Sequence, residues 1–235
     1  MMKGNKTKSA FIIIDMENGF VEPESAHCIK NAMATVPALV DSIDAARKMN
    51  IPVFFVKRIY RKDGSDVELT RFGGWKENGK AMTPGSIGKN SAEMVEGLKP
   101  KPGDYSIIKP RWSAFFQTEL DLILRRLGIR TVILTGTTTP NCVRTTAYDA
   151  NALDYNVVVL EDCCSSQTEE IQRVNIEDMS RMGAVILNSE EFIKDYEKCP
   201  IADALDKVQD CMNMDADIPE PFGTDETNCG WCDRW

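Results

Sequence analysis

Histidine is almost absent from this chain of 235 residues, in which His27 is the only one. Histidine is the side chain that enzymes use most often as a general acid or base, and it is a common zinc ligand. The composition therefore argues against histidine-based catalysis and against most zinc enzymes. An enzyme with this sequence needs another general base.

Positive charge and long apolar runs are also scarce. Lysine and arginine number 28 against 36 acidic residues, which leaves a net charge of −8. Nucleic acids and anionic membranes bind basic surfaces, so we expect neither as a partner. The apolar run over 10–14 ends at Asp15 and is far shorter than the roughly 18 residues that a membrane span requires. It is also too short for a secretory signal, so we expect a cytoplasmic protein.

Cysteine, in contrast, occurs eight times. In a chain of this length without a secretory signal, we expect reduced thiols rather than a disulfide framework. Most such thiols behave as small buried hydrophobes, and Cys163 and Cys164 are expected in the core or at the edge of a crevice. The cysteines are Cys28, Cys142, Cys163, Cys164, Cys199, Cys211, Cys229 and Cys232.

Short apolar runs rich in valine and isoleucine alternate with segments of helical periodicity. Such runs are typical of strands in a parallel sheet that is covered on both faces. Their alternation predicts an α/β fold, namely a doubly wound, three-layer domain around a central, mostly parallel six-stranded sheet. The expected strands lie at 10–15, 51–57, 105–109, 131–136, 156–162 and 183–188, and the expected helices at 33–49, 115–127, 142–154 and 169–182.

The chain divides into one domain over 1–197 and a C-terminal extension over 198–235, which is acidic and contains prolines and four of the cysteines. Within the domain, residues 58–104 are rich in glycine, lysine and arginine and show no clear periodicity. A long irregular insertion in a compact domain is usually functional, so we interpret this one as a lid or pocket wall. A solvated loop is the alternative.

Polar residues follow three of the expected strands: Asp15, Lys109 and, one short turn later, Cys142. Ligands of open parallel sheets bind beyond the carboxyl ends of the strands, so this acid, ammonium and thiol are expected to converge in one crevice. Each residue alone has an ordinary alternative, because an aspartate can form a turn, a lysine can be solvated and a cysteine can be core. Their joint placement favours catalysis.

Cys142 stands where a helix is expected to begin. Thr139 can cap that helix through its hydroxyl, and Pro140 suits the first helical position. The N–H groups and the positive end of the helix dipole favour a thiolate, and Lys109 would lower the pKa of the thiol further. The same N–H groups can hold an oxyanion. The pattern therefore predicts a nucleophilic cysteine with a lowered pKa.

The expected general base for this thiol is Asp15. A carboxylate enclosed in a crevice can have a raised pKa and can act first as a base and then as an acid. His27 follows the turn-like stretch "EPES" and is the weaker candidate.

Three stretches, "FIIIDMENGF", "IIKPRWSAFFQTELDLILRRLGIRTVILTG" and "TTTPNCVRTTAYDA", resemble the three motif regions of the isochorismatase-like cysteine hydrolases in order and spacing. The resemblance covers about residues 8 to 195. Three dispersed motifs at the correct strand ends are more specific than one short pattern. Within that superfamily, "KPRWSAFFQTELD" is most similar to the branch of ureidoacrylate, biuret and carbamoylsarcosine amidohydrolases.

The resemblance implies a catalytic triad of Asp15, Lys109 and Cys142. It also implies a cis peptide between Thr137 and Thr138, and an oxyanion hole made by the N–H groups of Thr138 and Cys142. Isochorismate-cleaving members lack the nucleophilic cysteine that this chain has. Nicotinamidases carry a metal site with an Asp-x-His pattern and a further histidine, which this chain lacks, so no metal and no other cofactor is expected.

The expected activity is a metal-independent cysteine amidohydrolase that cleaves a C–N amide bond of a small carbamoyl, ureido or primary amide substrate through a thioester. Asn18, Phe20, Arg111 and Trp112 are candidates for substrate binding, and the Arg111 guanidinium offers a fork suited to a carboxylate. Trp112 packing a loop and Arg111 pairing at the surface are the alternatives. Related enzymes imply a homodimer or homotetramer.

Arg58, Arg61 and Arg71 of the insertion are further candidates for the pocket, although a solvated charge run is the favoured interpretation of them.

Two alternative functions remain open. One is a nicotinamidase-like hydrolysis of an aromatic amide. The other is a non-catalytic or redox module that uses the C-x-x-C pair of Cys229 and Cys232. A structural zinc site usually has two tight pairs, and only one is present in the extension. We expect the extension to pack through Trp231 and Trp235 on the domain or on a neighbouring subunit.

Overall fold

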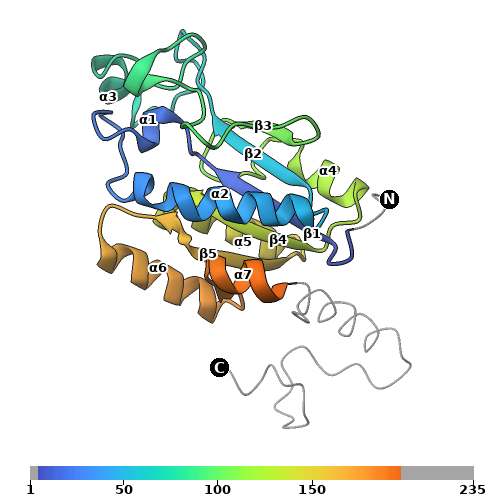
Figure 1. Ribbon diagram of the computed structural model, residues 1–235. Coiled ribbons are helices and arrows are strands. Elements are labelled where there is room, and N and C mark those ends of the chain that lie inside the picture. The colour runs from blue at the N-terminus through green and yellow to red at the C-terminus, as the bar shows by residue number, and fades with distance from the viewer. Residues whose placement is uncertain (1–4, 197–235) are drawn as a thin grey trace, which may run out of the picture.

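Residues 5–196 are described by the computed structural model, and they form a parallel sheet between two layers of helices (Figure 1). The strands are β1 (Ser9–Ile14), β2 (Val53–Arg58), β3 (Tyr105–Lys109), β4 (Thr131–Thr137), β5 (Asn156–Ser165) and β6 (Val185–Leu187). The α-helices are α1 (Asn18–Val21), α2 (Ala32–Lys48), α3 (Phe72–Glu77), α4 (Leu120–Arg126), α5 (Arg144–Ala152), α6 (Glu169–Arg181) and α7 (Ser189–Asp195). A 3-10 turn, Gly88–Asn90, and a π-helical turn, Thr139–Val143, complete the set.

All neighbouring strands of the sheet run parallel, in the order β3-β2-β1-β4-β5-β6. The chain first builds outward from β1 to β3 and then returns to add β4, β5 and β6 on the other side of β1. The strand order therefore reverses between β1 and β4, where Ile14 lies beside Gly136. Doubly wound sheets bind their ligands at this switch point. The predicted α/β fold with six parallel strands is confirmed.

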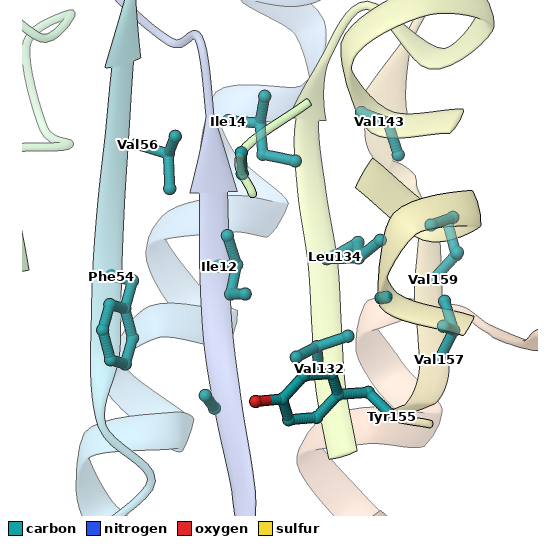
Figure 2. Close-up of a cluster of buried hydrophobic side chains, with 14 of the residues drawn as sticks. Ile12, Ile14, Phe54, Val56, Val132, Leu134, Val143, Tyr155, Val157 and Val159 are labelled. Atoms are coloured by element: carbon teal, nitrogen blue, oxygen red, sulfur yellow. The ribbon is translucent and has the colours of Figure 1, made fainter. Parts of the chain in front are cut away.

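The two faces of the sheet bury separate apolar clusters, because successive side chains of a strand point to opposite faces. Ile12 and Ile14 of β1 belong to one cluster, which Figure 2 shows with Val56 and Leu134. Helices α4, α5 and α6 contribute to that cluster. Phe11 of the same strand belongs to the other cluster, with residues from α2 and α7. Every residue of β1 is buried, which explains its unbroken apolar sequence.

Gly136 lets β4 approach β1 at the switch point. Its φ is +101°, and a Cβ atom there would lie 2.1 Å from the carbonyl oxygen of Ile14. The pairing of β4 with β5 also shifts register between Leu134 and Gly136. Only glycine fits this backbone, so it allows the segment after β4 to lie against the end of β1.

Most element boundaries fall within a few residues of expectation, with two informative exceptions. The helix expected from 115 begins at Leu120, because Gln117 has a left-handed φ of 53° that interrupts a helix. Strand β5 runs on to Ser165, beyond the expected end at 162, and buries Cys163 and Cys164 in the core.

The insertion over 58–104 packs around a small apolar cluster that also includes Phe20 of α1, and it is more ordered than a solvated loop. Trp75 of α3 is buried, and its indole N–H donates to the Ala81 carbonyl at 3.0 Å. The cluster comprises Phe20, Tyr60, Val67, Trp75, Ala81, Met82 and Ala92.

The predicted C-terminal extension, with its four cysteines and two tryptophans, lies outside the described residues. Within residues 5–196, no helix is long and apolar enough to cross a bilayer.

Candidate active site

Asp15 and Lys109 form a buried ion pair at the carboxyl ends of their strands. Lys109 Nζ lies 2.8 Å from Asp15 Oδ2, and neither residue is more than 1% exposed. Asp15 follows β1 with φ at 50°, and its N–H donates to the Val56 carbonyl. Lys109 is the last residue of β3, and its ammonium also donates to the Arg111 carbonyl at 2.9 Å. Such a pair persists in a protein interior because each charge offsets the burial of the other.

Cys142 lies in the π-helical turn that leads into α5, and only 5% of it is exposed. The Thr146 hydroxyl donates to its carbonyl at 2.7 Å. Burial and then the charge of Asp15 raise the pKa of the Cys142 thiol, while Lys109 and, after it, Arg58 act in the opposite direction. The prediction of a lowered pKa was therefore wrong for the resting site, because the thiol is desolvated and faces a carboxylate. The neutral thiol must lose its proton to a base before it can attack.

The expected cis peptide is present between Thr137 and Thr138. The hydroxyl groups of Thr137, Thr138 and Thr139 all donate to the carbonyl of Ser165, at 3.5, 3.2 and 3.0 Å. The end of β5 thus holds the segment that carries the nucleophile.

The candidate catalytic groups lie around one cavity of about 310 Å³. Asp15, Cys142 and Thr138 lie in its wall, whereas Lys109 lies behind Asp15 in full burial. Asp15 is the only acidic residue among those that line it. The insertion supplies Arg58, Tyr60, Val67, Arg71, Trp75 and Met82, and the segment over 26–29 supplies Ala26, His27, Cys28 and Ile29.

The four candidates for substrate binding separate into two pairs. Phe20 and Trp112 line the cavity, whereas Asn18 and Arg111 do not. The Arg111 guanidinium donates to the carbonyl groups of Asp66 and Pro110, so it fastens a loop instead of facing the crevice. Asn18 lies in the wall of a different pocket, and its backbone N–H donates to the Glu93 carbonyl. We do not propose either residue as a substrate contact.

The arginines of the insertion also have different positions. Arg61 is exposed, as a solvated charge would be. Arg71 is exposed but lines the cavity. Arg58 is fully buried, and its Nη2 lies 3.6 Å from Cys142 Sγ, so the solvated interpretation is wrong for this residue.

The sequence analysis named Arg58 as a pocket candidate but favoured solvation, although its place at the end of β2, beside Lys109 at the end of β3, could have indicated a role in the site. The rule that ligands gather at strand ends applies to both. Its partners Tyr60 and Glu68 carry no such signal, since they lie in the irregular insertion.

Glu17 is a buried carboxyl group near the ion pair that the sequence analysis did not identify. Its Oε1 accepts the backbone N–H of Arg58 at 2.5 Å. Burial and the charge of Asp15 raise the pKa of Glu17 to about 8. The group is therefore largely protonated at neutral pH.

His27 lines the cavity with its Nε2 buried and without a hydrogen-bond partner among the described residues. Burial and then the charge of Arg71 lower the pKa of His27. Its imidazole is therefore neutral at pH 7 and available to a ligand.

Across the part of the chain that the structure describes, no three His, Cys, Asp or Glu side chains cluster as metal ligands would.

Comparison with known proteins places this geometry in a family. The model of the isochorismatase domain matches residues 9–191. The chain is 38% identical over 178 residues to a probable inactive nicotinamidase from Arabidopsis thaliana, which covers 74% of this chain and 89% of the relative. It is 28% identical over 214 residues to a ureidoacrylate amidohydrolase, RutB, from Azorhizobium caulinodans, with coverage of 82% and 92%.

A solved structure of an isochorismatase family protein from Desulfovibrio vulgaris is also similar. It is 39% identical, has a TM-score of 0.75, and the match covers 86% of this chain and 98% of that one. The parallel sheet with its switch point and the family match over most of the chain lead to one assignment: this chain belongs to the isochorismatase family of hydrolases.

Proposed function

We propose that this protein is a cysteine amidohydrolase that cleaves a C–N bond of a small carbamoyl, ureido or primary amide substrate. The observation that carries the proposal is that Asp15, which is ion-paired with the buried Lys109, lies in the wall of the same cavity as Cys142. A base, a balancing cation and a nucleophile at one cavity are the parts that covalent amide hydrolysis requires. The ureidoacrylate amidohydrolase among the relatives supports this class of reaction.

Asp15 acts as the general base in this proposal. Its Oδ1 is buried and accepts no hydrogen bond from any described residue, so it can take the proton of the Cys142 thiol. The thiolate sulfur then forms a bond to the carbonyl carbon, and the carbonyl electrons move onto its oxygen. N–H groups of Thr138 and Cys142 receive that oxyanion. Lys109 keeps a positive charge beside Asp15 throughout.

The C–N bond breaks when the tetrahedral intermediate collapses. The leaving ammonia or amine takes the proton that Asp15 holds, and a thioester to Cys142 remains. Asp15 then removes a proton from a water molecule, which attacks the thioester carbonyl. Collapse of this second intermediate releases the acid product, and the sulfur recovers the proton from Asp15.

The cavity favours a small substrate, because 310 Å³ is near the lower end of the range for ligand pockets. It also favours an anionic group. Within residues 5–196 no carboxylate forms an ion pair with Arg71, whereas Arg58 is paired with Glu68. Arg71 is therefore the arginine of the cavity whose charge can pair with a substrate carboxylate. A ureido or amide compound that carries a carboxylate fits these walls.

A second candidate, hydrolysis of an aromatic amide, is favoured by a different observation. Phe20, Tyr60, Trp75 and Trp112 all line the cavity and offer rings against which a planar substrate could stack. The nicotinamidase relative is named as probably inactive, and that statement concerns the relative alone.

The test is release of ammonia from a panel of N-carbamoyl amino acids, ureidoacrylate-like acids, biuret, maleamate and nicotinamide. Wild type and Cys142→Ala are compared, each with and without a chelator. We expect release by wild type alone, unaffected by chelation, with carboxylate-bearing substrates preferred over nicotinamide. Inhibition by the chelator, or activity in Cys142→Ala, would contradict the proposal.

The double variant Cys229→Ala/Cys232→Ala distinguishes the redox alternative from the amidase. Both residues lie outside the described residues, and the variant should retain the amidase activity. Disulfide reduction that depends on these two residues and survives Cys142→Ala would support the redox module instead.

We also propose a homodimer or homotetramer. Light scattering at micromolar concentration tests this, and a monomer would contradict it.

A further inference from the structure

The Arg58 guanidinium is in direct contact with the sulfur of Cys142. Its Nη2 donates to Cys142 Sγ at 3.6 Å, a normal distance for a hydrogen bond to sulfur. The triad alone does not explain this contact, because Lys109 is directed to Asp15 at 2.8 Å. A fully buried guanidinium is costly unless a counterion and hydrogen bonds offset the burial of its charge.

The counterion is Glu68, a residue of the insertion. Arg58 Nη1 lies 2.6 Å from Glu68 Oε1 and also donates to the Tyr60 hydroxyl at 3.0 Å. The Tyr60 hydroxyl in turn donates to Glu68 Oε2 at 3.0 Å. The three side chains are all buried, and their mutual hydrogen bonds hold the guanidinium in position, although its Nε has no partner among the described residues.

Arg58 and Glu68 both remain charged near neutral pH. Burial acts to lower the pKa of Arg58, but the effects of Cys142, Asp15 and Tyr60 together outweigh it. The pKa of Arg58 is therefore raised, and the guanidinium stays protonated. Burial acts to raise the pKa of Glu68, but the charge of Arg58 and the hydrogen bonds that the carboxylate accepts together outweigh it, so the pKa of Glu68 is lowered. Glu68 is therefore ionised and offsets the charge of Arg58 at rest.

We propose that Arg58 is a fourth catalytic residue, which stabilises the Cys142 thiolate, and that Glu68 and Tyr60 of the insertion are positioning residues that hold its guanidinium against the sulfur. The proposal extends the reaction described above and rests on Cys142 being its nucleophile. It assigns a catalytic role to a segment outside the three motif regions of the sequence.

The charges around the sulfur explain why such a residue is needed. When the thiol proton moves to Asp15, negative charge leaves the carboxylate, which Lys109 faces, and appears on the sulfur, which Arg58 Nη2 faces. No bond to Arg58 forms or breaks, and its protons stay in place. The guanidinium thus favours the thiolate over the thiol and shifts the proton transfer toward attack.

Two other roles for Arg58 make different predictions. If Arg58 bound a substrate carboxylate, its loss would raise KM and leave the reactivity of the free thiol unchanged. If it served only to hold the insertion, its loss would lower stability without changing the pH dependence of the thiol. The thiol of the free enzyme therefore distinguishes the three roles and needs no substrate.

The experiment measures the rate of Cys142 alkylation by iodoacetamide from pH 6 to 10, by mass spectrometry of the Cys142 peptide in the full chain. The variants are Arg58→Gln, Glu68→Gln, Tyr60→Phe and the neutral pair Arg58→Gln/Glu68→Gln. Arg61→Gln, which removes an exposed arginine of the same insertion, is the matched control. Thermal unfolding of each variant establishes that it is folded.

We expect Arg58→Gln, and the neutral pair, to slow alkylation at pH 7.5 by a factor of about 10 or more and to move the profile to higher pH, since an opposite charge within hydrogen-bond reach shifts a pKa by about 1–3 units. Glu68→Gln and Tyr60→Phe should have smaller effects of the same sign, and Arg61→Gln should match wild type. With the best substrate, Arg58→Gln should lower kcat more than it raises KM.

An unchanged alkylation profile in a folded Arg58→Gln or in the folded neutral pair would overturn the proposal, as would a rise in KM alone. Because alkylation uses no substrate, an Arg58-dependent profile supports the role of Arg58 at the sulfur even if no amide in the panel is hydrolysed. In that case the amidase assignment fails and the thiolate site stands.

Discussion

The two sides of the cavity are built in different ways. On the side of the sheet, Asp15, Lys109 and Cys142 occupy positions set by the ends of β1, β3 and β4. On the side of the insertion, residues between 58 and 82 are held by a small apolar cluster and by hydrogen bonds among their side chains. Strand topology thus places the reacting groups, whereas the insertion surrounds them with charge and aromatic surface. Substitutions on the sheet side should therefore affect kcat or stability, whereas a substitution at the mouth of the cavity on the insertion side should affect KM.

The largest effect is expected on the sheet side, from Asp15→Asn. The amide cannot accept the thiol proton, so kcat for the best substrate should fall by about 10²–10⁴-fold, the usual contribution of a general base. Single-turnover kinetics give the measurement, with unfolding curves as the control for structure. A loss below tenfold would exclude Asp15 as the base and leave His27, the other titratable base in the cavity wall, as the candidate.

The second largest effect is expected at Gly136, where the backbone of β4 approaches β1 on the sheet side. Gly136→Ala places a Cβ atom 2.1 Å from the Ile14 carbonyl oxygen at a φ of +101°, so the ends of β1 and β4 must separate. We expect a loss of about 3 kcal/mol or more in the free energy of unfolding, measured by urea denaturation. Gly73→Ala, in α3 with no atom within 4 Å of the added Cβ, is the control and should be neutral or slightly stabilising. Equal stability of the two variants would show that the close approach is not required.

Glu17 joins the two sides, and its ionisation should make stability depend on pH. Its pKa is 4.5 in the unfolded chain and about 8 in the fold, so the stabilisation is fully present below pH 4.5 and is lost as the pH rises through 8. Between pH 6 and 8 the free energy of unfolding should fall by about 1 kcal/mol per pH unit more in wild type than in Glu17→Gln. The glutamine keeps an oxygen for the Arg58 N–H. Parallel curves for the two proteins would contradict a buried neutral Glu17.

The smallest effect is expected at the mouth of the cavity on the insertion side. Arg71→Gln should raise KM for a carboxylate-bearing substrate by about tenfold and leave kcat nearly unchanged, because a charge-assisted hydrogen bond contributes about 1.5 kcal/mol or more. A neutral amide substrate should show no change in KM. If kcat fell for both substrates, Arg71 would act on the reacting groups and the comparison between the two sides would need revision.

The amino-acid sequence was enough to predict the parallel α/β sheet and the three strand-end residues of the candidate triad. The reason is physical: apolar runs can be satisfied only inside a covered sheet, and parallel strands bring all their carboxyl ends to one edge. Cys142 was predicted for the same reason, since it follows such a run by one short turn, whereas the close approach at Gly136 was not predicted.

The tertiary structure alone decided what surrounds those residues. It buried Cys142 so that the pKa of its thiol rises instead of falling, and it directed Arg111 to loop carbonyls while it brought Arg58 to the sulfur. Local sequence cannot specify such outcomes, because a pKa depends on burial and on charges that come from distant parts of the chain. The partner of a side chain in an irregular insertion is likewise set by tertiary packing. Such a segment has no hydrophobic periodicity from which the partner could be predicted.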